Sequence, residues 1–539
     1  MPNDDYGYGD WTHTWPDDPA WKDSLGEGYK AFLGTKASRT PMIYVGANDG
    51  MLHAFNASRS TSSGGGDEVF AFIPAGARNH LYELANPGYD HRYFVDGELA
   101  VADVSFTSTG SGNWQTVLVG STGAGGAAIP SGGTSAGHGS VFALNVSSPA
   151  GFDGDDVLWE LSGQDDEYLG FVLGKPVIVP VGAGTGGAPR WVAIFGNGPN
   201  SDDGRPVLFV VDIRTGEVLS RLMPASSGYA SRNGLMNIAP IAISNRHGLV
   251  DTVYGGDLQG NLWKFDLSDP NPGNWGIAYG NGNAPLFTAG IGDSLQPIAG
   301  GIEVSSGPGG GVSVFFGTGS YFAEEDRDNN GVQSLYAIWD NLSNPISGRG
   351  ALVGHSLRQG GVSSGYRFRG IEASPVNYVA SRGWYVDLVI EGAALGERFI
   401  GTPRLQSGKV IFVAYEPNEA MVCATGGGVN WEYALDMMTG AGGMSGISTE
   451  PGGESVCVGD CAGIALEGGG TGGDDGPSAP VRNTSIFVPP ITPCDPDDDD
   501  CTVEDLIEAE RCTFVLRAPG ADALFMPRPC GRQSWRQLQ

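Results

Sequence analysis

Oxygen-bearing side chains recur at alternate positions in the stretch Asp-Arg-Asp-Asn-Asn-Gly-Val-Gln-Ser, residues 326–334. Calcium takes about six to eight oxygen ligands, and its loops present acidic or amide side chains at alternate positions, then a glycine turn and a backbone carbonyl. The candidate calcium ligands are therefore Asp326, Asp328, Asn330, the carbonyl of Val332, and Ser334. Ala337 stands where such loops end in a bidentate glutamate, so a solvated acidic turn between two strands is an equal alternative.

Two enzyme-like patterns fail in their sequence context. Residues 182–187 fit the glycine fingerprint of dinucleotide-binding proteins, but a predicted strand, Trp191 to Phe195, follows where a helix is required. Residues 133–137 fit the Gly-X-Ser-X-Gly elbow of hydrolases but lie inside a glycine-rich loop. His53 occupies a repeat position where the other copies carry aromatic residues, which favours a packed histidine.

A β-hairpin pattern recurs along the chain and would position these loops. It is clearest at residues 251–267, where two apolar and aromatic runs flank a turn centred on Gln259-Gly260-Asn261. Five further copies follow the same pattern, at residues 44–56, 118–145, 194–212, 315–338 and 411–436.

The first run of each hairpin ends at a small residue, and these residues mark a repeat. They are Gly46, Gly120, Gly196, Gly255, Gly317 and Ala414. Intervals of roughly 60 to 100 residues each have room for one four-stranded propeller blade with its loops, and the last has room for another blade around residues 366–388. We therefore expect an all-β fold, a modified β-propeller of six or seven blades, closed so that no long strand edge is exposed.

The composition of the 539 residues limits the class of protein. With 88 glycines and 34 prolines the chain is rich in turns, whereas 40% hydrophobic residues in strand-sized runs indicate a globular protein. A net charge of −31 disfavours nucleic acid and anionic lipid as partners. The sequence contains no apolar run long enough for a membrane span, and its first residues lack signal-peptide features. We expect a truncated start, so the missing signal says nothing about location.

The composition also changes along the chain and predicts three parts. Residues 1–38 form a lead-in whose helical segment, Trp21 to Leu33, caps or leads into the first blade. Residues 39–440 form the propeller. Residues 441–539 are glycine-rich, acidic and cysteine-containing, and we expect them to be loosely ordered, with isolated strands at 486–488 and 514–516.

All seven cysteines lie in the last quarter of the chain, at Cys423, Cys457, Cys461, Cys494, Cys501, Cys512 and Cys530. No Cys-X-X-Cys pair or nearby histidine offers the spacing of a zinc site, so disulfides are favoured over a metal. The nearest pairs are Cys494 with Cys501 and Cys512 with Cys530, and one cysteine stays unpaired.

Several long motifs resemble the C-terminal domain of the PilC/PilY family of type IV pilus tip-associated adhesins. They are YVGANDGMLHAFN at 44–56, HRYFVDG at 91–97, FGNGPNS at 195–201, YGGDLQGNLWKFDL at 254–267, FGTGSYF at 316–322, QSLYAIWD at 333–340, GER at 396–398 and GRQSWRQL at 531–538. The resemblance covers roughly residues 30–440 and the extreme C-terminus, and the length and order of the motifs make it specific.

This resemblance implies a modified β-propeller carried outside the cell, at the tip of a type IV pilus. The implied partners are the minor pilins of a pilus priming complex and a surface receptor, host or abiotic. The implied function is that of a non-enzymatic adhesin that assists pilus assembly, counters retraction, and supports attachment and twitching motility.

The family commonly carries a calcium loop directly before the motif that begins at Tyr254. Asp251 matches the final ligand of that loop, and Asn245 is the one earlier alternate position that keeps an oxygen-bearing side chain. Two such residues and a carbonyl cannot fill a calcium shell without several waters, so tight binding is not expected there.

An enzyme is the alternative function. Quinone-dependent dehydrogenases also build propellers whose blades end in aspartate followed by Thr-Gly, as at residues 212–216 and 436–440. We cannot assemble a cofactor cage and catalytic carboxylate from these residues, which favours the adhesin.

Overall fold

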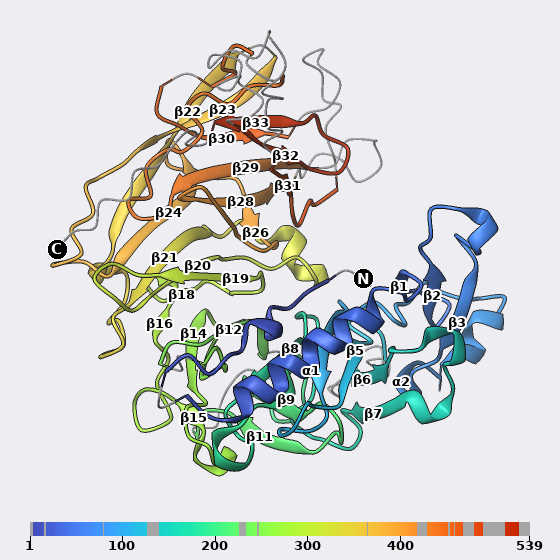
Figure 1. Cartoon of the computed structure of the whole chain (residues 1–539). Helices are drawn as coiled ribbons and strands as arrows, with labels where there is room; N and C mark the ends of the chain where they lie inside the picture. Colours follow the sequence, from blue (N-terminus) through green and yellow to red (C-terminus); the bar gives the residue numbers. More distant parts are fainter. Residues whose placement is uncertain are drawn as a thin grey trace, which may run out of the picture. The chain divides into compact units, whose positions relative to one another are not determined.

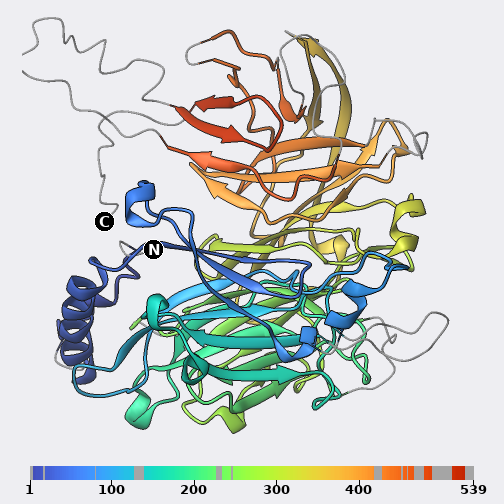
Figure 2. The ribbon, with the colours of Figure 1, turned by 90° about the vertical axis from the view of Figure 1, so that its right-hand side faces the viewer.

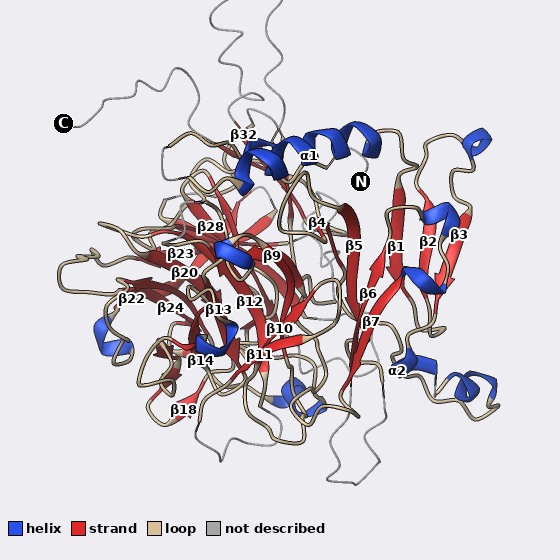
Figure 3. Cartoon of the chain, turned by 60° about the horizontal axis from the view of Figure 1, so that its bottom comes forward, coloured by secondary structure: helices blue, strands red, loops and turns tan. Residues whose placement is uncertain are grey.

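The computed structural model describes residues 4–15, 18–78, 80–126, 139–225, 233–244, 247–363, 365–417, 428–450, 453–457, 459–466, 479–488 and 513–527. The chain forms two compact units, residues 1–286 and 287–539. Strands make up most of the regular structure in both units (Figure 3). None of the described helices combines the length and apolar character that crossing a membrane requires.

Unit 1 contains four antiparallel sheets that follow one another in chain order (Figures 1 and 2). The first sheet has three strands: β1 (Met42–Gly46), β2 (Leu52–Asn56) and β3 (Glu68–Phe72). The second and third have four each: β4 (Ala100–Ser105), β5 (Trp114–Ser121), β6 (Ser140–Asn145) and β7 (Val157–Ser162), then β8 (Val177–Val181), β9 (Arg190–Gly196), β10 (Leu208–Asp212) and β11 (Val218–Leu222). The fourth contains β12 (Leu235–Ile241), β13 (Thr252–Asp257), β14 (Asn261–Asp266) and β15 (Gly276–Ile277).

The six hairpins expected from the sequence are all present as antiparallel pairs: β1 with β2, β5 with β6, β9 with β10, β13 with β14, β20 with β21, and β28 with β29. In the clearest copy, Gly255 pairs with Trp263 across β13 and β14. The glycine fingerprint at 182–187 lies in the turn between β8 and β9, as its context predicted. The Gly-X-Ser-X-Gly pattern at 133–137 lies outside the described residues.

The central strands of unit 1 are buried on both faces. In β5, Leu118 packs with Leu52 of the first sheet, whereas its neighbours Val117 and Val119 pack with Phe195 of the third sheet. Because successive side chains of a strand point to opposite faces, a sheet enclosed between two others needs apolar residues at every position. This explains why the hairpin runs are continuously apolar instead of alternating.

The repeated glycine marks a close approach of chain segments. A side chain at Gly46 would overlap the carbonyl of Val95, and one at Gly196 would overlap the carbonyl of Leu235, where β12 begins. In unit 2, a side chain at Gly317 would overlap Phe399. Glycine at these repeat positions therefore lets neighbouring segments of the chain approach closely.

Helix α1 (Trp21–Lys36) is the longest described helix, and α2 (Ala75–Arg78) is a single turn. The buried side chains of α1 recur every three or four residues, at Trp21, Leu25, Tyr29, Phe32 and Lys36. The rings of Tyr29 and Trp114 lie 4.7 Å apart, so α1 packs on the second sheet, and along the chain it leads into β1 of the first sheet, as the sequence suggested. Gly28 allows this because a side chain there would overlap the backbone of Ser111.

Unit 2 contains one large sheet in place of separate blades. It joins β19 (Ile302–Ser306), β20 (Val312–Gly317), β21 (Ser334–Asp340), β24 (Gly383–Ile390), β22 (Val353–Ser363), β23 (Tyr366–Glu372), β30 (Cys461–Ala465), β29 (Val429–Asp436), β28 (Lys409–Glu416) and β26 (Arg398–Phe399) in that spatial order, with β25 (Ala393–Ala394) beside β24 and β27 (Arg404–Gln406) beside β28. β22 and β24 pair in parallel, which lets the extra strands at 353–390 continue the sheet. Short strands β16 (Phe287–Thr288), β17 (Gly290–Ile291) and β18 (Ser294–Leu295) precede it.

The segment beyond residue 440 is partly built into unit 2. β30 lies between β23 and β29 of the large sheet, although the composition placed it outside the propeller. The strands expected to be isolated pair with each other, since β31 (Ser485–Phe487), β32 (Thr513–Arg517) and β33 (Leu524–Pro527) form one antiparallel sheet. Phe514 and Leu516 of this sheet are buried against Ile464 of β30.

Candidate functional site: acidic loops and buried polar networks

The candidate calcium loop begins with a short 3-10 helix, Glu324–Asp328. The Asp326 carboxylate accepts hydrogen bonds from the Ser320 hydroxyl at 2.6 Å and from the backbone N–H groups of Phe322 and Ala323 at 3.0 Å each. It is therefore satisfied by donors that precede it in the chain, and as the third residue of the helix it reaches back to the N–H of the N-cap residue Ala323.

A guanidinium group occupies the carbonyl side of the same loop. Arg398 donates through Nη1 to the carbonyl of Asp326 and through Nη2 to that of Asn329, the latter at 2.6 Å. Its Nε donates to the carbonyl of Gly396 at 2.8 Å, and the side chain is buried. Arg398 thus places a positive charge beside the loop and binds two of its backbone carbonyls, neither of which is a candidate calcium ligand.

The remaining candidate ligands differ in their exposure to solvent. Gln296 donates from Nε2 to the Val332 carbonyl and to the Ser334 hydroxyl, at 2.8 Å each. Ser334 in turn donates to Asp387 at 2.6 Å. Asp328 and Asn330 are exposed. Within the described parts of the chain, no three acidic, histidine or cysteine side chains come together as a metal site.

The degenerate family loop is closed by hydrogen bonds to Asp251. Its carboxylate accepts from the N–H of Ile243 at 2.9 Å, and from the N–H and hydroxyl of Ser244 at 2.8 and 2.7 Å. Burial raises the pKa of Asp251, but these donors outweigh burial and hold it below its ordinary value. Asn245, the other candidate, lies outside the described residues.

Asp257, which the sequence analysis did not single out, organises the clearest hairpin. One oxygen accepts from the backbone N–H groups of Gln259 and Asn261, and the other from Asn261 Nδ2 and Trp263 Nε1, all at 2.9 Å. Complete burial raises the pKa of Asp257 despite these donors. The motif that begins at Tyr254 therefore encodes a hairpin held from inside by one carboxylate.

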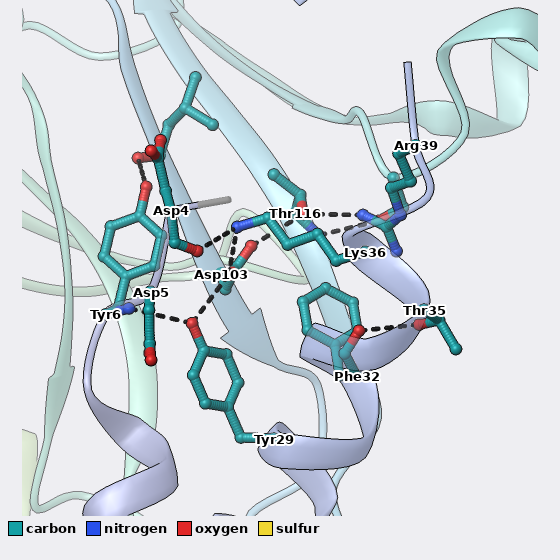
Figure 4. A network of polar contacts seen from close by, with 12 residues as sticks. Asp4, Asp5, Tyr6, Tyr29, Phe32, Thr35, Lys36, Arg39, Asp103 and Thr116 are labelled. Atoms are coloured by element: carbon teal, nitrogen blue, oxygen red, sulfur yellow. Dashed lines mark hydrogen bonds and ion pairs between the residues drawn. The ribbon is translucent and has the colours of Figure 1, made fainter. Parts of the chain in front are cut away.

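A second buried carboxylate, Asp103 of β4, fastens the N-terminal segment to the second sheet. Lys36 Nζ lies 2.7 Å from it, the Tyr29 hydroxyl 2.9 Å and the Thr116 hydroxyl 2.8 Å (Figure 4). Lys36 also donates to the carbonyl of Asp4 at 2.9 Å. Removing one member would leave the other charge buried and unpaired, at a cost of about 3–5 kcal/mol.

Unit 2 has a comparable network around Arg369. The guanidinium donates to Glu397 and Tyr433, and to Glu416 at 2.9 Å, and it lies 3.6 Å from the Trp431 ring. Tyr433 donates to Glu397 at 2.8 Å. The GER motif at 396–398 is therefore structural, since Glu397 serves this network and the adjacent Arg398 serves the acidic loop.

Two smaller expectations concern His53 and the cysteines. His53 lies between Glu68 and Asp49, at 2.5 and 2.9 Å, and its hydrogen bond to Glu68 raises the pKa of His53. His53 is therefore ion-paired rather than simply packed.

Cys457 and Cys461 form a disulfide, which confirms the preference for disulfides over a metal. The four cysteines of the predicted pairs lie outside the described residues.

Comparison with known proteins places these features in a family. The family model described as the PilY1 beta-propeller domain matches residues 21–361. A type IV pilus biogenesis factor PilY1 homolog of Xylella fastidiosa is 40% identical over 95% of this chain and 34% of its own length. PilY1 of Pseudomonas aeruginosa PAO1 is 33% identical over 76% of this chain and 36% of its own.

A solved structure agrees with these sequence matches. The crystal structure of the Pseudomonas aeruginosa PilY1 C-terminal domain superposes with a TM-score of 0.67 at 25% identity, covering 94% of this chain and 97% of that one. The chain spans about a third of the length of the curated relatives it matches. The shared motifs, the propeller sheets and these matches agree, and the chain belongs to the PilY1 β-propeller family.

Proposed function

We propose that the chain is the propeller region of a non-enzymatic type IV pilus tip adhesin that acts outside the cell. In this role it docks on minor pilins, assists pilus assembly, counters retraction, and supports surface attachment and twitching motility. The observation that carries the proposal is the 40% identity, over 95% of the chain, to a relative named as a type IV pilus biogenesis factor.

The geometry of the blade endings supports this function over the enzyme. Asp212 accepts three hydrogen bonds at one oxygen, from Arg214 N–H and from the N–H and hydroxyl of Thr215, at 2.8 to 3.0 Å. Asp436 accepts the same set from the N–H of Met438 and from the N–H and hydroxyl of Thr439. Both Asp-X-X-Thr-Gly endings, which suggested a quinone-dependent propeller, are thus turns closed on their own backbone.

Co-purification with minor pilins tests the proposal. The chain is co-expressed in the periplasm with the minor pilins of one type IV pilus system and isolated through a tag on the chain. We expect the pilins to be retained, and the isolated protein to show no quinone absorbance after incubation with the cofactor and a divalent cation. Loss of the pilins on washing, or a stoichiometric quinone band, would overturn the proposal.

A further inference from the structure

The first sheet of unit 1 is one strand short. The sheets β4–β7, β8–β11 and β12–β15 each begin with a strand that pairs antiparallel with the strand leading to the repeat glycine, as β4 pairs with β5 and β8 with β9. β1 is the corresponding strand of the first sheet, because it ends in Gly46, and within the described residues it pairs with β2 alone. Among the residues that the structure describes, the position that β4 fills beside β5 has no strand beside β1.

The open side of β1 carries regularly spaced backbone donors and acceptors. Ala47 donates to Met51 and Ala57 donates to Pro41 across the hairpin. In an antiparallel pair, alternate residues exchange both hydrogen bonds with the partner strand. The N–H and C=O groups of Met42, Tyr44 and Gly46 therefore point away from β2, and no hydrogen bond between described residues uses them.

β1 also lacks the features that protect a natural sheet edge. Such edges carry a charge, a proline or a bulge that discourages further pairing. The first strands of the third and fourth sheets each contain a proline, namely Pro180 in β8 and Pro240 in β12. β1, with the sequence Met-Ile-Tyr-Val-Gly, has none, and its register on β2 is regular. Ile43 and Val45 are 57% and 43% exposed.

Two hollows run beside the open side of β1. The larger, of about 400 Å³, is lined by Tyr44–Asn48 on one side and by residues 95–97 and 99 on the other. The smaller, of about 40 Å³, is lined by Lys36, Arg39, Met42 and Tyr44, among others. Tyr44 lines both hollows, Met42 lines the smaller and Gly46 the larger.

We propose that β1 takes up an extended strand of another polypeptide, antiparallel to it, as the fourth strand of the first sheet. Main-chain hydrogen bonds at Met42, Tyr44 and Gly46 supply the attachment, as in other cases of strand addition. Apolar side chains at alternate positions of the incoming strand cover the exposed faces of Ile43 and Val45.

The neighbouring sheet indicates one further property of the incoming strand. When Gly46 is matched to Gly120, the register of β4 on β5 places the counterpart of Asp103 opposite Met42. Arg39 lies at this end of the hollow, donates to the Thr116 hydroxyl at 3.0 Å, and forms no ion pair with a described carboxylate. An acidic residue at that position of the incoming strand would meet the guanidinium.

The probe is a synthetic peptide with the sequence LAVADVSF, which is that of residues 99–106 and so of the strand in the equivalent position. Binding to the full chain is measured by fluorescence anisotropy and by hydrogen exchange at single residues. We expect saturable binding and new protection at the amides of Met42, Tyr44 and Gly46, with the amides of Ile43 and Val45 protected before and after. Replacing the aspartate of the peptide by asparagine should weaken binding about threefold to tenfold.

Variants separate strand addition from unspecific binding. Ile43→Lys places a charge on the edge and should weaken binding at least tenfold, whereas Val379→Lys, at a position 97% exposed in unit 2, should leave it unchanged. Both variants should keep the wild-type melting temperature, which excludes misfolding as the cause. Equal binding by Ile43→Lys, or no new protection at saturating peptide, would overturn the proposal. So would amides at Met42, Tyr44 and Gly46 that are already protected in the free monomer, or protection that appears only with self-association.

Discussion

Glu432 of β29 provides the sharpest test of the buried electrostatics in unit 2. It is fully buried, and neither carboxylate oxygen has a hydrogen-bond partner among the described residues. Its strand neighbours Val413 and Ile464 belong to an apolar cluster. Burial raises the pKa of Glu432 from 4.5 to about 7.

The sign and size of the effect on stability follow from this pKa. Below pH 4.5 the carboxyl is protonated in the folded and unfolded states, and burial of the neutral form is tolerated. Between pH 4.5 and 7 the unfolded chain releases the proton while the folded chain retains it, so stability falls as pH rises. Above pH 7 the loss reaches a plateau of about 3 kcal/mol, since each pKa unit corresponds to about 1.4 kcal/mol.

The test is Glu432→Gln, which keeps the shape and removes the titration. The variant should equal the wild type near pH 4.5 and exceed it by about 3 kcal/mol at pH 8, which is a rise of roughly 6 °C or more in the melting temperature of a unit of this size. Calorimetry from pH 4.5 to 8.5 measures the difference. Glu372→Gln, at an exposed position of β23, is the control and should show no trend. A gain that does not change with pH would refute the reasoning.

Four further predictions concern the other networks. Asp257→Asn should lower the stability of unit 1 by roughly 2–4 kcal/mol, seen as a lower urea midpoint, because an amide cannot accept from all four donors; the exposed Asp266→Asn should not. Arg398→Met should make residues 326–334 sensitive to limited proteolysis in the native protein, since two loop carbonyls lose their donor; cleavage at the wild-type rate would argue against the anchor. Calcium at millimolar concentration should release little heat with the wild type, because the Asp326 carboxylate is already satisfied by Ser320, Phe322 and Ala323; strong binding that Asp328→Ala abolishes would instead support the calcium site. Replacing Cys457 and Cys461 by serine should lower the stability of unit 2 by about 2 kcal/mol. Non-reducing peptide maps should link Cys494 to Cys501 and Cys512 to Cys530, and free thiols at these four positions would be the contrary result.

The hairpins could be predicted because their signal is local. Val253, Tyr254 and Trp263 are strand-forming residues on either side of a turn, and nothing distant is needed to read them. The large sheet of unit 2 could not be predicted in the same way. β22 pairs with β24 in parallel, and β30 enters between β23 and β29 from far along the chain. Such pairings depend on which strand edges meet in the folded chain, and no turn residue in the sequence indicates them.

The polar sites show the same division. Alternate oxygens at 326–334 are visible in the sequence, but the bond between Arg398 and the carbonyl of Asn329 spans 69 residues and has no local signal. Asp257 could have been found, since an aspartate followed by Gly260 and Asn261 is a typical capped turn. Asp103 could not, because its partners Lys36 and Tyr29 lie 67 and 74 residues away along the chain and leave no local signal.

The close approach at the repeat glycines has a consequence for suppressor genetics. A residue that collides with a neighbouring side chain can be rescued by shortening that neighbour, whereas a collision with a backbone carbonyl leaves no partner to change. Gly255 faces the side chain of Leu235, so Gly255→Ala should be rescued by a smaller residue at 235. Gly46 and Gly196 face carbonyls, and selection for restored folding should return only true revertants at those two positions. Repeat positions that look equivalent in the sequence would then tolerate substitution to different degrees, according to whether a side chain or a backbone carbonyl faces the glycine.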